Sequence, residues 1–179
     1  MQESHKLHIY VDGSCSENRN VTAITKAGWG FCVIEGDSGT GNGKGNLLAE
    51  MHGEVVTDSE SEGHLGAEVG SNNTAELSAI AHALRWLLTQ VGVVAATIRG
   101  DSVYALKISS GVWKAKANRE LAKRVQSLWH ETSLHLELRG EHVAAHRGHR
   151  WNERADHLAF RAMQREGPLP LQFWKPGMR

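Results

Sequence analysis

The feature that most constrains the fold is an amphipathic segment in the middle of the chain. Its apolar residues recur at intervals of three or four: Leu77, Ile80, Ala81, Leu84, Leu87, Leu88 and Val91. This spacing places them on one face of an α-helix. Asn72 or Asn73 is suited to the N-cap of that helix, and Gly92 to its stop. Such a helix needs another apolar layer to cover.

Strand-like runs on both sides of the helix supply that layer. Segments rich in β-branched and aromatic residues predict strands at 6–11, 27–34, 95–99 and 134–145, the last with an irregularity at Arg139–Gly140. Residues 36–45 carry five glycines and predict a flexible hairpin connection. Residues 47–57 and 64–69 are both candidates for a third strand, on either side of an acidic excursion at 58–62.

Further helices are expected after the central one. Ser102 is positioned to cap a short helix that runs to Ile108, and longer helices are predicted at 118–132 and 151–165. The element order β-β-β-α-β-α-α-β-α predicts an α/β fold in which helices cover the faces of a mixed sheet.

The length of the chain is typical of one domain. At 179 residues it can bury an ordinary core. We predict a domain over residues 1–166, with an acidic, glycine-rich insertion at about 36–69. All three prolines fall in the tail 167–179, which we expect to be non-helical, and either packed through Phe173 and Trp174 or free to bind a partner.

Composition limits the functional classes. With 40% hydrophobic and 22% charged residues the chain is globular rather than disordered. No segment approaches the roughly 18 to 20 apolar residues of a membrane span, and the N-terminal residues lack the apolar region of a signal peptide. We therefore expect a soluble cytoplasmic protein with no membrane partner, in which Cys15 and Cys32 are free thiols.

The net charge of zero conceals an asymmetry. Residues 1–100 contain six Lys and Arg against 12 Asp and Glu, whereas residues 101–179 contain 14 against eight. This distribution is compatible either with a basic surface beside an acidic pocket or with a dipolar surface that has no function.

Four acidic residues lie where strands end or helices start: Asp12, Glu76, Asp101 and Asp156. Taken singly, each has a structural explanation, as a turn residue or as a partner of a helix dipole. For two of them, the position within the helical period does not favour a purely structural role. Glu76 precedes Ile80 by four residues, and Asp156 precedes Ala159 by three, so both carboxylates lie off the solvent face. A carboxylate on the core side of a helix needs a partner.

The residues around these acids closely resemble the type 1 ribonuclease H family. The matching motifs are Asp-Gly-Ser at 12–14, Ser-Asn-Asn-Thr-Ala-Glu-Leu at 71–77, Asp-Ser-Val-Tyr at 101–104, and a histidine loop leading to Asn-Glu and Asp at 146–156. They occur in the family's order, and the resemblance covers roughly residues 6–165. It implies a ribonuclease H-like fold, a five-stranded mixed sheet with helices on both faces.

The resemblance also implies an activity. Family members cut the RNA strand of an RNA–DNA hybrid with two Mg²⁺ ions held by four carboxylates, leaving a 5′-phosphate and a 3′-hydroxyl. Here the ligands would be Asp12, Glu76, Asp101 and Asp156, a set of hard oxygen donors that suits Mg²⁺ or, in its place, Mn²⁺. His146 would lie on the mobile loop whose histidine assists proton transfer or product release.

Contacts with the hybrid are also implied. The candidate substrate-binding residues are Asn18, Ser71, Asn72, Asn73, Trp113, Lys114 and Asn152. The basic, Trp-containing element around Trp113 is short here, and Ala144 stands where relatives have a lysine. We therefore expect a monomer that binds its hybrid more weakly, and with less dependence on salt, than relatives with the full element.

Other interpretations stay open at this point. A transposase, integrase or resolvase would share acidic residues on the same fold. An inactive scaffold and the ribonuclease H domain of a retroelement polyprotein are further alternatives. His142, His146 and His149 also have a spacing that resembles a zinc site.

Overall fold

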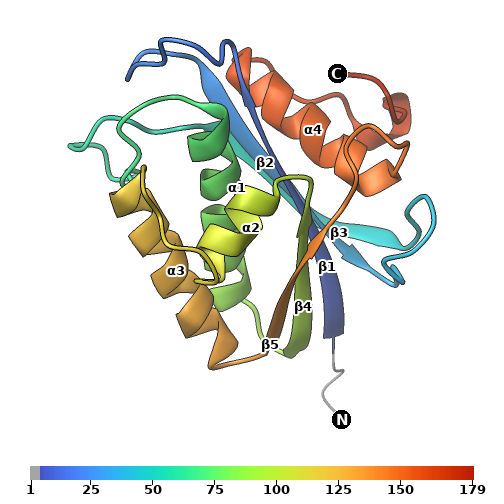
Figure 1. Cartoon of the computed structure of the whole chain (residues 1–179). Coiled ribbons are helices and arrows are strands. Elements are labelled where there is room, and N and C mark those ends of the chain that lie inside the picture. The colour runs from blue at the N-terminus through green and yellow to red at the C-terminus, as the bar shows by residue number, and fades with distance from the viewer. Residues whose placement is uncertain (1–4) are drawn as a thin grey trace.

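One mixed sheet forms the centre of the molecule in the computed structural model, which describes residues 5–179 (Figure 1). Its strand order is β3-β2-β1-β4-β5. The strands are β1 (His5–Cys15), β2 (Ala27–Glu35), β3 (Asn46–Glu54), β4 (Val93–Gly100) and β5 (Glu137–His142). The pairs β1–β2 and β2–β3 are antiparallel, whereas β1–β4 and β4–β5 are parallel. The predicted hairpin connection at 36–45 joins β2 to β3 and is confirmed.

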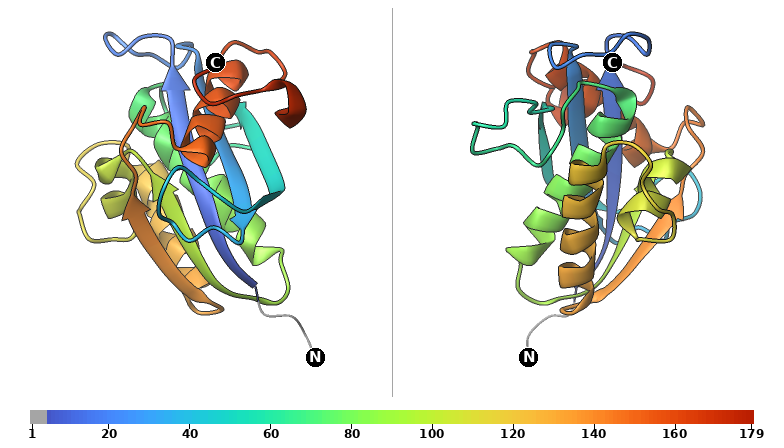
Figure 2. Two further views of the ribbon diagram at one scale, coloured as in Figure 1. Left: turned by 90° about the vertical axis from the view of Figure 1, so that its right-hand side faces the viewer. Right: turned by 60° about the vertical axis from the view of Figure 1, so that its left-hand side comes forward.

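Helices cover both faces of this sheet, as Figure 2 shows from two sides. The helices are α1 (Asn72–Leu88), α2 (Val103–Ser109), α3 (Arg119–Ser133), α4 (Arg150–Met163) and the short 3₁₀ helix η1 (Leu171–Phe173). Helix α1 packs on β1 and β2, and α3 packs on α1. Helix α4 lies on the opposite face, against β1 and β2. The predicted fold class is confirmed.

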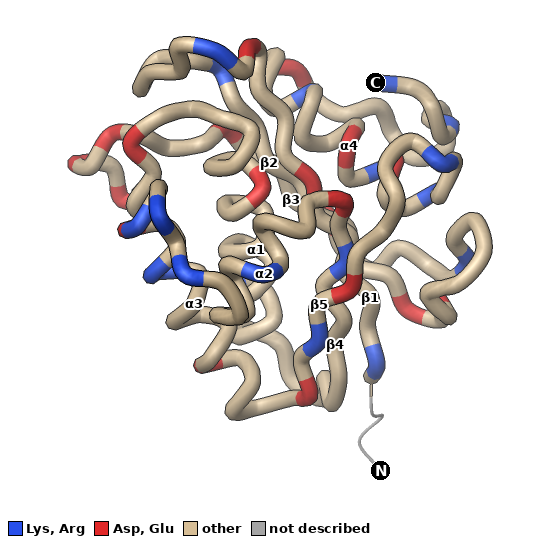
Figure 3. Tube along the Cα trace, viewed as in Figure 1, with Lys and Arg blue, Asp and Glu red and all other residues tan. Residues whose placement is uncertain are grey.

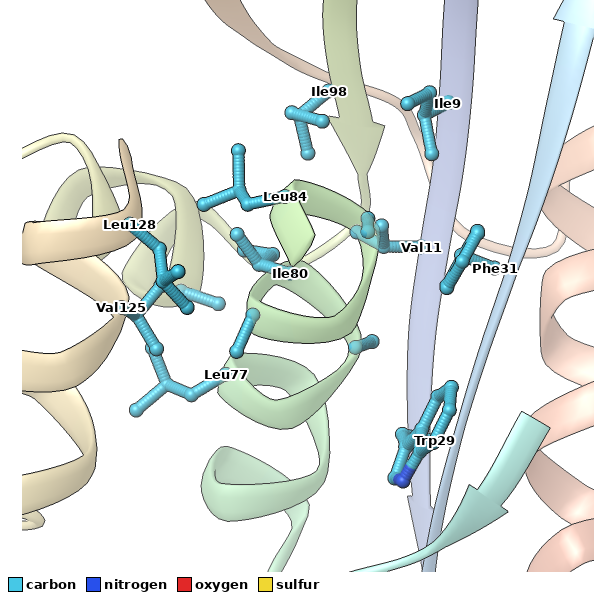
Figure 4. Packing of buried hydrophobic residues seen from close by; sticks show 14 of the residues in the cluster. Ile9, Val11, Trp29, Phe31, Leu77, Ile80, Leu84, Ile98, Val125 and Leu128 are labelled. Atoms are coloured by element: carbon cyan, nitrogen blue, oxygen red, sulfur yellow. The ribbon is translucent and has the colours of Figure 1, made fainter. Parts of the chain in front are cut away.

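The two apolar layers of the core follow from strand alternation in β1 and β2. Ile9 and Val11 of β1 join the cluster under α1, whereas Tyr10 joins the cluster under α4. Figure 4 shows the first cluster, in which Leu77, Ile80 and Leu84 of the predicted helical stripe pack in the core between the sheet and α3. All three side chains are fully buried, so their removal from water stabilises the packing of α1 in this core.

The ends of α1 differ from the prediction. The N-cap is Ser71, not Asn72 or Asn73: its hydroxyl accepts from the Thr74 amide at 3.1 Å, and the Thr74 hydroxyl accepts from the Ser71 amide at 2.8 Å. This reciprocal pair satisfies two amides at once. The helix ends at Leu88, before Gly92, and Val91 is therefore exposed. By contrast, the predicted Ser102 cap of α2 is confirmed.

Two strand predictions were wrong in extent. Only 46–54 forms the third strand, and 64–69 is not a strand, so the predicted insertion at 36–69 contains the edge strand β3. β5 spans only 137–142, so it is shorter at both ends than the predicted strand, and α3 extends to Ser133 before it. Gly140 pairs with Ile98 without the expected irregularity. A Cβ at this position would lie 3.1 Å from the ring of Trp129, so glycine allows the indole to pack closely against β5.

The tail folds back onto α4. It contains η1, a departure from the expected non-helical segment. The tail was expected either to pack through Phe173 and Trp174 or to be free. Trp174 is buried, in agreement with packing, whereas Phe173 is 67% exposed. Among the described helices none combines the length and apolarity needed to cross a membrane.

Candidate metal centre

Three of the four predicted carboxylates come together near the end of the central strands. Each of Asp12, Glu76 and Asp101 offers an oxygen, and these oxygens lie within 4.8 Å of one another. Asp101 directly follows β4, as predicted. Asp12 does not end its strand, however, because β1 continues to Cys15 and Asp12 pairs with Gly30 of β2. The neighbouring parallel strands β1 and β4 thus bring two of the acids together.

A close contact between β1 and α1 adds Glu76 to this pair. A Cβ on Gly13 would lie 2.5 Å from the Glu76 amide nitrogen, so only glycine permits this approach. Glu76 is in the second turn of α1 rather than the first, which removes the helix-dipole explanation. Its exposed fraction is 3%, which confirms that it lies on the core side of the helix.

The cluster is electrostatically unfavourable without a counter-charge. Burial, with the charges of Asp101 and Asp156, raises the pKa of Glu76 to about 8. Burial and the charges of Glu76 and Asp101 raise the pKa of Asp12 well above its usual range. Burial raises the pKa of Asp101 as well, although Asn152 and His146 favour its ionised form. Like charges in a site of low polarity therefore hold protons that a cation would displace.

One buried carboxylate oxygen of the cluster has no hydrogen-bond partner among the described residues, and this bears on whether a cation fits the site. Glu76 Oε2 is inaccessible and accepts no hydrogen bond from any residue in the range 5–179. Leaving such an atom unpaired is costly. Asp12 Oδ1, by comparison, accepts from the Gly13 amide at 2.9 Å. An all-carboxylate donor set with an orphaned oxygen fits a hard divalent cation.

Asp156 lies beside this group but has a different partner. It is 7% exposed, which confirms its predicted position off the solvent face of α4. Both of its oxygens accept from the guanidinium of Arg179, from Nε at 3.1 Å and from Nη2 at 3.0 Å. The sequence analysis missed Arg179, and no spacing or motif in the sequence points to this pair.

The three loop histidines have different surroundings. His146 is exposed in the connection from β5 to α4, adopts a φ of 52°, and favours ionisation of Asp101, as does His142. His149 instead caps α4, and its Nε2 is 3.2 Å from the Tyr10 hydroxyl. In the part of the chain that the structure describes, the group suited to a metal comprises the three carboxylates and none of these histidines.

A polar network that the sequence analysis did not foresee anchors the start of α4. The Tyr10 hydroxyl donates to Asp37 and contacts His149. Burial, with Asp37, raises the pKa of Tyr10. This network fixes one end of the loop that carries His146. Its members are up to 139 positions apart, so the sequence carries no local signal for it.

Most of the proposed substrate residues lie on the surface of the protein. Ser71 caps α1, Asn72 and Asn73 are exposed in its first turn, and Asn18 is exposed beyond β1. Trp113 and Lys114 are exposed between α2 and α3, and with Asn73 they line one cavity of about 590 Å³. Asn152 differs, because it is 3% exposed and lies against Asp101.

The charge asymmetry has a spatial counterpart. Figure 3 shows Lys and Arg gathered along the connection from α2 and the first part of α3, and Asp and Glu along the loop that follows β3. The basic residues of this region are Lys114, Lys116, Arg119, Lys123 and Arg124. Lys114 and Lys116 line the cavity that contains Trp113 and Asn73, and Lys114, Arg119 and Lys123 line a second cavity with Trp113.

The strand order, the helices on both faces and the acidic group at the centre together define the class of fold. The chain belongs to the RNase H family, whose model matches residues 4–164. It is 30% identical over 174 residues to the ribonuclease H of Chromobacterium violaceum, covering 92% of this chain and 99% of the relative. It is 32% identical over 163 residues to that of Saccharopolyspora erythraea, covering 86% of this chain and 87% of the relative.

Solved structures agree with the family assignment. The N-terminal RNase H domain of a Mycobacterium tuberculosis protein matches with a TM-score of 0.63 and 27% identity, over 90% of this chain and 96% of that one. RNase H1 of Halobacterium salinarum matches with a TM-score of 0.62 and 24% identity, over 89% and 98%. LC11-RNase H1, solved in complex with an RNA/DNA hybrid, has the same fold, with a TM-score of 0.62 and 23% identity over 89% and 97%.

Proposed function

We propose that this protein is an endoribonuclease that hydrolyses the RNA strand of RNA–DNA hybrids and leaves 5′-phosphate and 3′-hydroxyl ends. The observation that carries the proposal is the buried group of Asp12, Glu76 and Asp101, with its unpartnered Glu76 oxygen, in a chain of the RNase H family. The donor set suits two Mg²⁺ ions, for which Mn²⁺ is a suitable substitute.

The chain's own residues have distinct roles in this proposal. Asp12, Glu76, Asp101 and Asp156 would hold the cations at the end of the central strands. When bound, two divalent cations activate the attacking water and stabilise the leaving oxygen of an in-line displacement. His146 is exposed and its charge favours the ionised form of Asp101, which supports a role for its imidazole in taking up or releasing a proton.

Recognition of the hybrid is assigned to the surface around the metal centre. Asn72 and Asn73 present amides at the start of α1, where they can contact the 2′-hydroxyls that distinguish RNA from DNA. Trp113 and Lys114 would contact the DNA strand, through stacking or apolar contact and through phosphate contact. The hybrid bound to LC11-RNase H1, a protein with the same fold, supports a hybrid as the substrate.

The decisive experiment compares three labelled duplexes of one sequence: an RNA–DNA hybrid, an RNA duplex and a DNA duplex. We expect cleavage of the RNA strand of the hybrid alone, dependent on Mg²⁺, with 5′-phosphate ends identified by mass spectrometry. Cleavage that persists in EDTA, or equal cleavage of the DNA duplex, would contradict the proposal.

His146→Ala is expected to lower the turnover of the hybrid by about 10²-fold, because the variant loses a proton carrier beside the metal centre. Steady-state kinetics with saturating hybrid measures the effect. The matched control is His135→Ala, which removes another exposed histidine, before the start of β5, whereas Asp101 follows the end of the parallel strand β4. A turnover equal to that of the control would remove His146 from the mechanism.

A further inference from the structure

The contact between Arg179 and Asp156 places a positive charge at the metal centre. Two parallel hydrogen bonds, at 3.0 and 3.1 Å, engage both oxygens of the carboxylate. The guanidinium also lies over the ring of Phe160, 4.5 Å from its centroid. The planar guanidinium of arginine can make a two-point contact with a carboxylate and stack on an aromatic face at the same time, which an ammonium group cannot. The contact is therefore a defined site for this side chain.

The rest of the tail holds Arg179 in reach of Asp156. Trp174 is 2% exposed and packs beside α4, and its indole nitrogen donates to the Met178 carbonyl at 3.0 Å. Farther back, the Leu169 amide donates to His157 at 2.9 Å, and Arg154 donates to the Leu169 carbonyl at 2.9 Å. These anchors fix both ends of the segment from Leu169 to Met178, so little further ordering is needed to place Arg179.

A divalent cation and this guanidinium would compete for the carboxylate oxygens of Asp156. Arg179 neutralises the carboxylate and occupies a lone-pair position on each of its oxygens, whereas a cation binds best to an ionised, uncompensated carboxylate. A positive charge beside the cluster also repels a second cation. The Arg179 side chain is 50% exposed and that of Asp156 is 10% exposed, so the pair is partly solvated and can be displaced.

We propose that Arg179 is a residue of the metal centre, an internal counter-ion that competes with divalent cations for Asp156 and so sets the cation concentration at which the site fills. This inference rests on the proposed function, since it takes Asp156 as a cation ligand. Cation binding releases the guanidinium from Asp156, and loss of the cation restores the pair.

Arg179→Ala tests the competition through cation affinity rather than activity. We expect the dissociation constant for Mn²⁺, measured from the free-ion EPR signal and checked by Mg²⁺ competition, to fall about two- to fivefold, as the strength of partly exposed ion pairs implies. Arg179→Lys keeps the charge but not the two-point contact, so its affinity should lie between those of wild type and Arg179→Ala. Lys175→Ala removes an exposed cation from the same tail and should match wild type.

A second measurement reports on the arginine itself. In ¹⁵N spectra the Arg179 Nε–H resonance should shift during Mg²⁺ titration with the same midpoint as cation binding, because its acceptor is lost. An unchanged dissociation constant in Arg179→Ala, or a value that Lys175→Ala reproduces, would overturn the inference. If cation binding also survives Asp12→Asn and Asp156→Asn undiminished, it is the proposed function that fails. If those variants lose cation binding while Arg179→Ala matches wild type, the counter-ion role alone fails.

Discussion

Asp12→Asn is expected to reduce hydrolysis of an RNA–DNA hybrid by at least about 10³-fold, since a bound cation supplies several kcal/mol of transition-state stabilisation. Asparagine has nearly the shape of aspartate and keeps the carbonyl oxygen that accepts from the Gly13 amide. It lacks the negative charge and one of the oxygens that a cation requires. The substitution therefore removes a cation ligand from the buried cluster without leaving a cavity.

The measurement is single-turnover cleavage of a labelled hybrid in excess Mg²⁺. The control is Asp58→Asn, the same change of atoms in an exposed loop, and it should cleave as wild type does. Thermal unfolding without metal shows whether the Asp12 variant is folded, and its stability should equal or exceed that of wild type because a repulsive charge is gone. A folded Asp12→Asn protein with wild-type turnover would exclude Asp12 as a cation ligand.

Glu76→Gln is expected to stabilise the metal-free protein at pH 8 by several kcal/mol. Burial raises the pKa of Glu76 to about 8 in the folded protein, against a usual value of 4.5. A group whose pKa is raised by folding contributes stability below its unfolded pKa, and that contribution is lost as the pH rises through the folded value. With each pKa unit worth about 1.4 kcal/mol, the loss between pH 4.5 and 8 is large.

The difference between the two proteins isolates Glu76 from opposing titrations. Burial lowers the pKa of His82 to about 4, and burial also lowers that of His157, so these groups favour folding more as the pH rises. Wild-type stability alone would mix both effects. Urea unfolding of wild type and Glu76→Gln in EDTA, at pH 5 and pH 8, should show a gap that widens with pH.

Two controls complete this experiment. Glu60→Gln, at an exposed loop position, should follow the wild-type pH profile. Adding Mg²⁺ at pH 8 should stabilise wild type more than Glu76→Gln, because a ligand stabilises the state that binds it. A gap of the same size at both pH values would show that Glu76 is ionised at an ordinary pKa, and that the cluster is less strained than its burial indicates.

Much of the fold could be predicted because its signals are local. The stripe from Leu77 to Leu87 is buried as its period requires, and Ser102 caps α2 as its position suggested. The errors fall where long-range packing decides. Residues 64–69 were predicted as a possible strand, but they do not pair with any described strand of the sheet, whose edge on this side is formed by β3. Gly140 was predicted to mark an irregularity in its strand, but the strand pairs regularly there and the missing side chain leaves space for the ring of Trp129.

The sequence alone determined which four acidic residues are candidates and, for two of them, which face of a helix they occupy, since side-chain type and helical period are properties of short segments. Helical period predicted that Glu76 and Asp156 lie on the core side of their helices, and both are buried. Only the tertiary structure decided which carboxylates come together: Asp12, Glu76 and Asp101 form one group, whereas Asp156 is hydrogen-bonded to Arg179. Such pairings depend on how the sheet and the helices pack and where the tail returns, and contacts between distant segments leave no periodic trace in the order of residues.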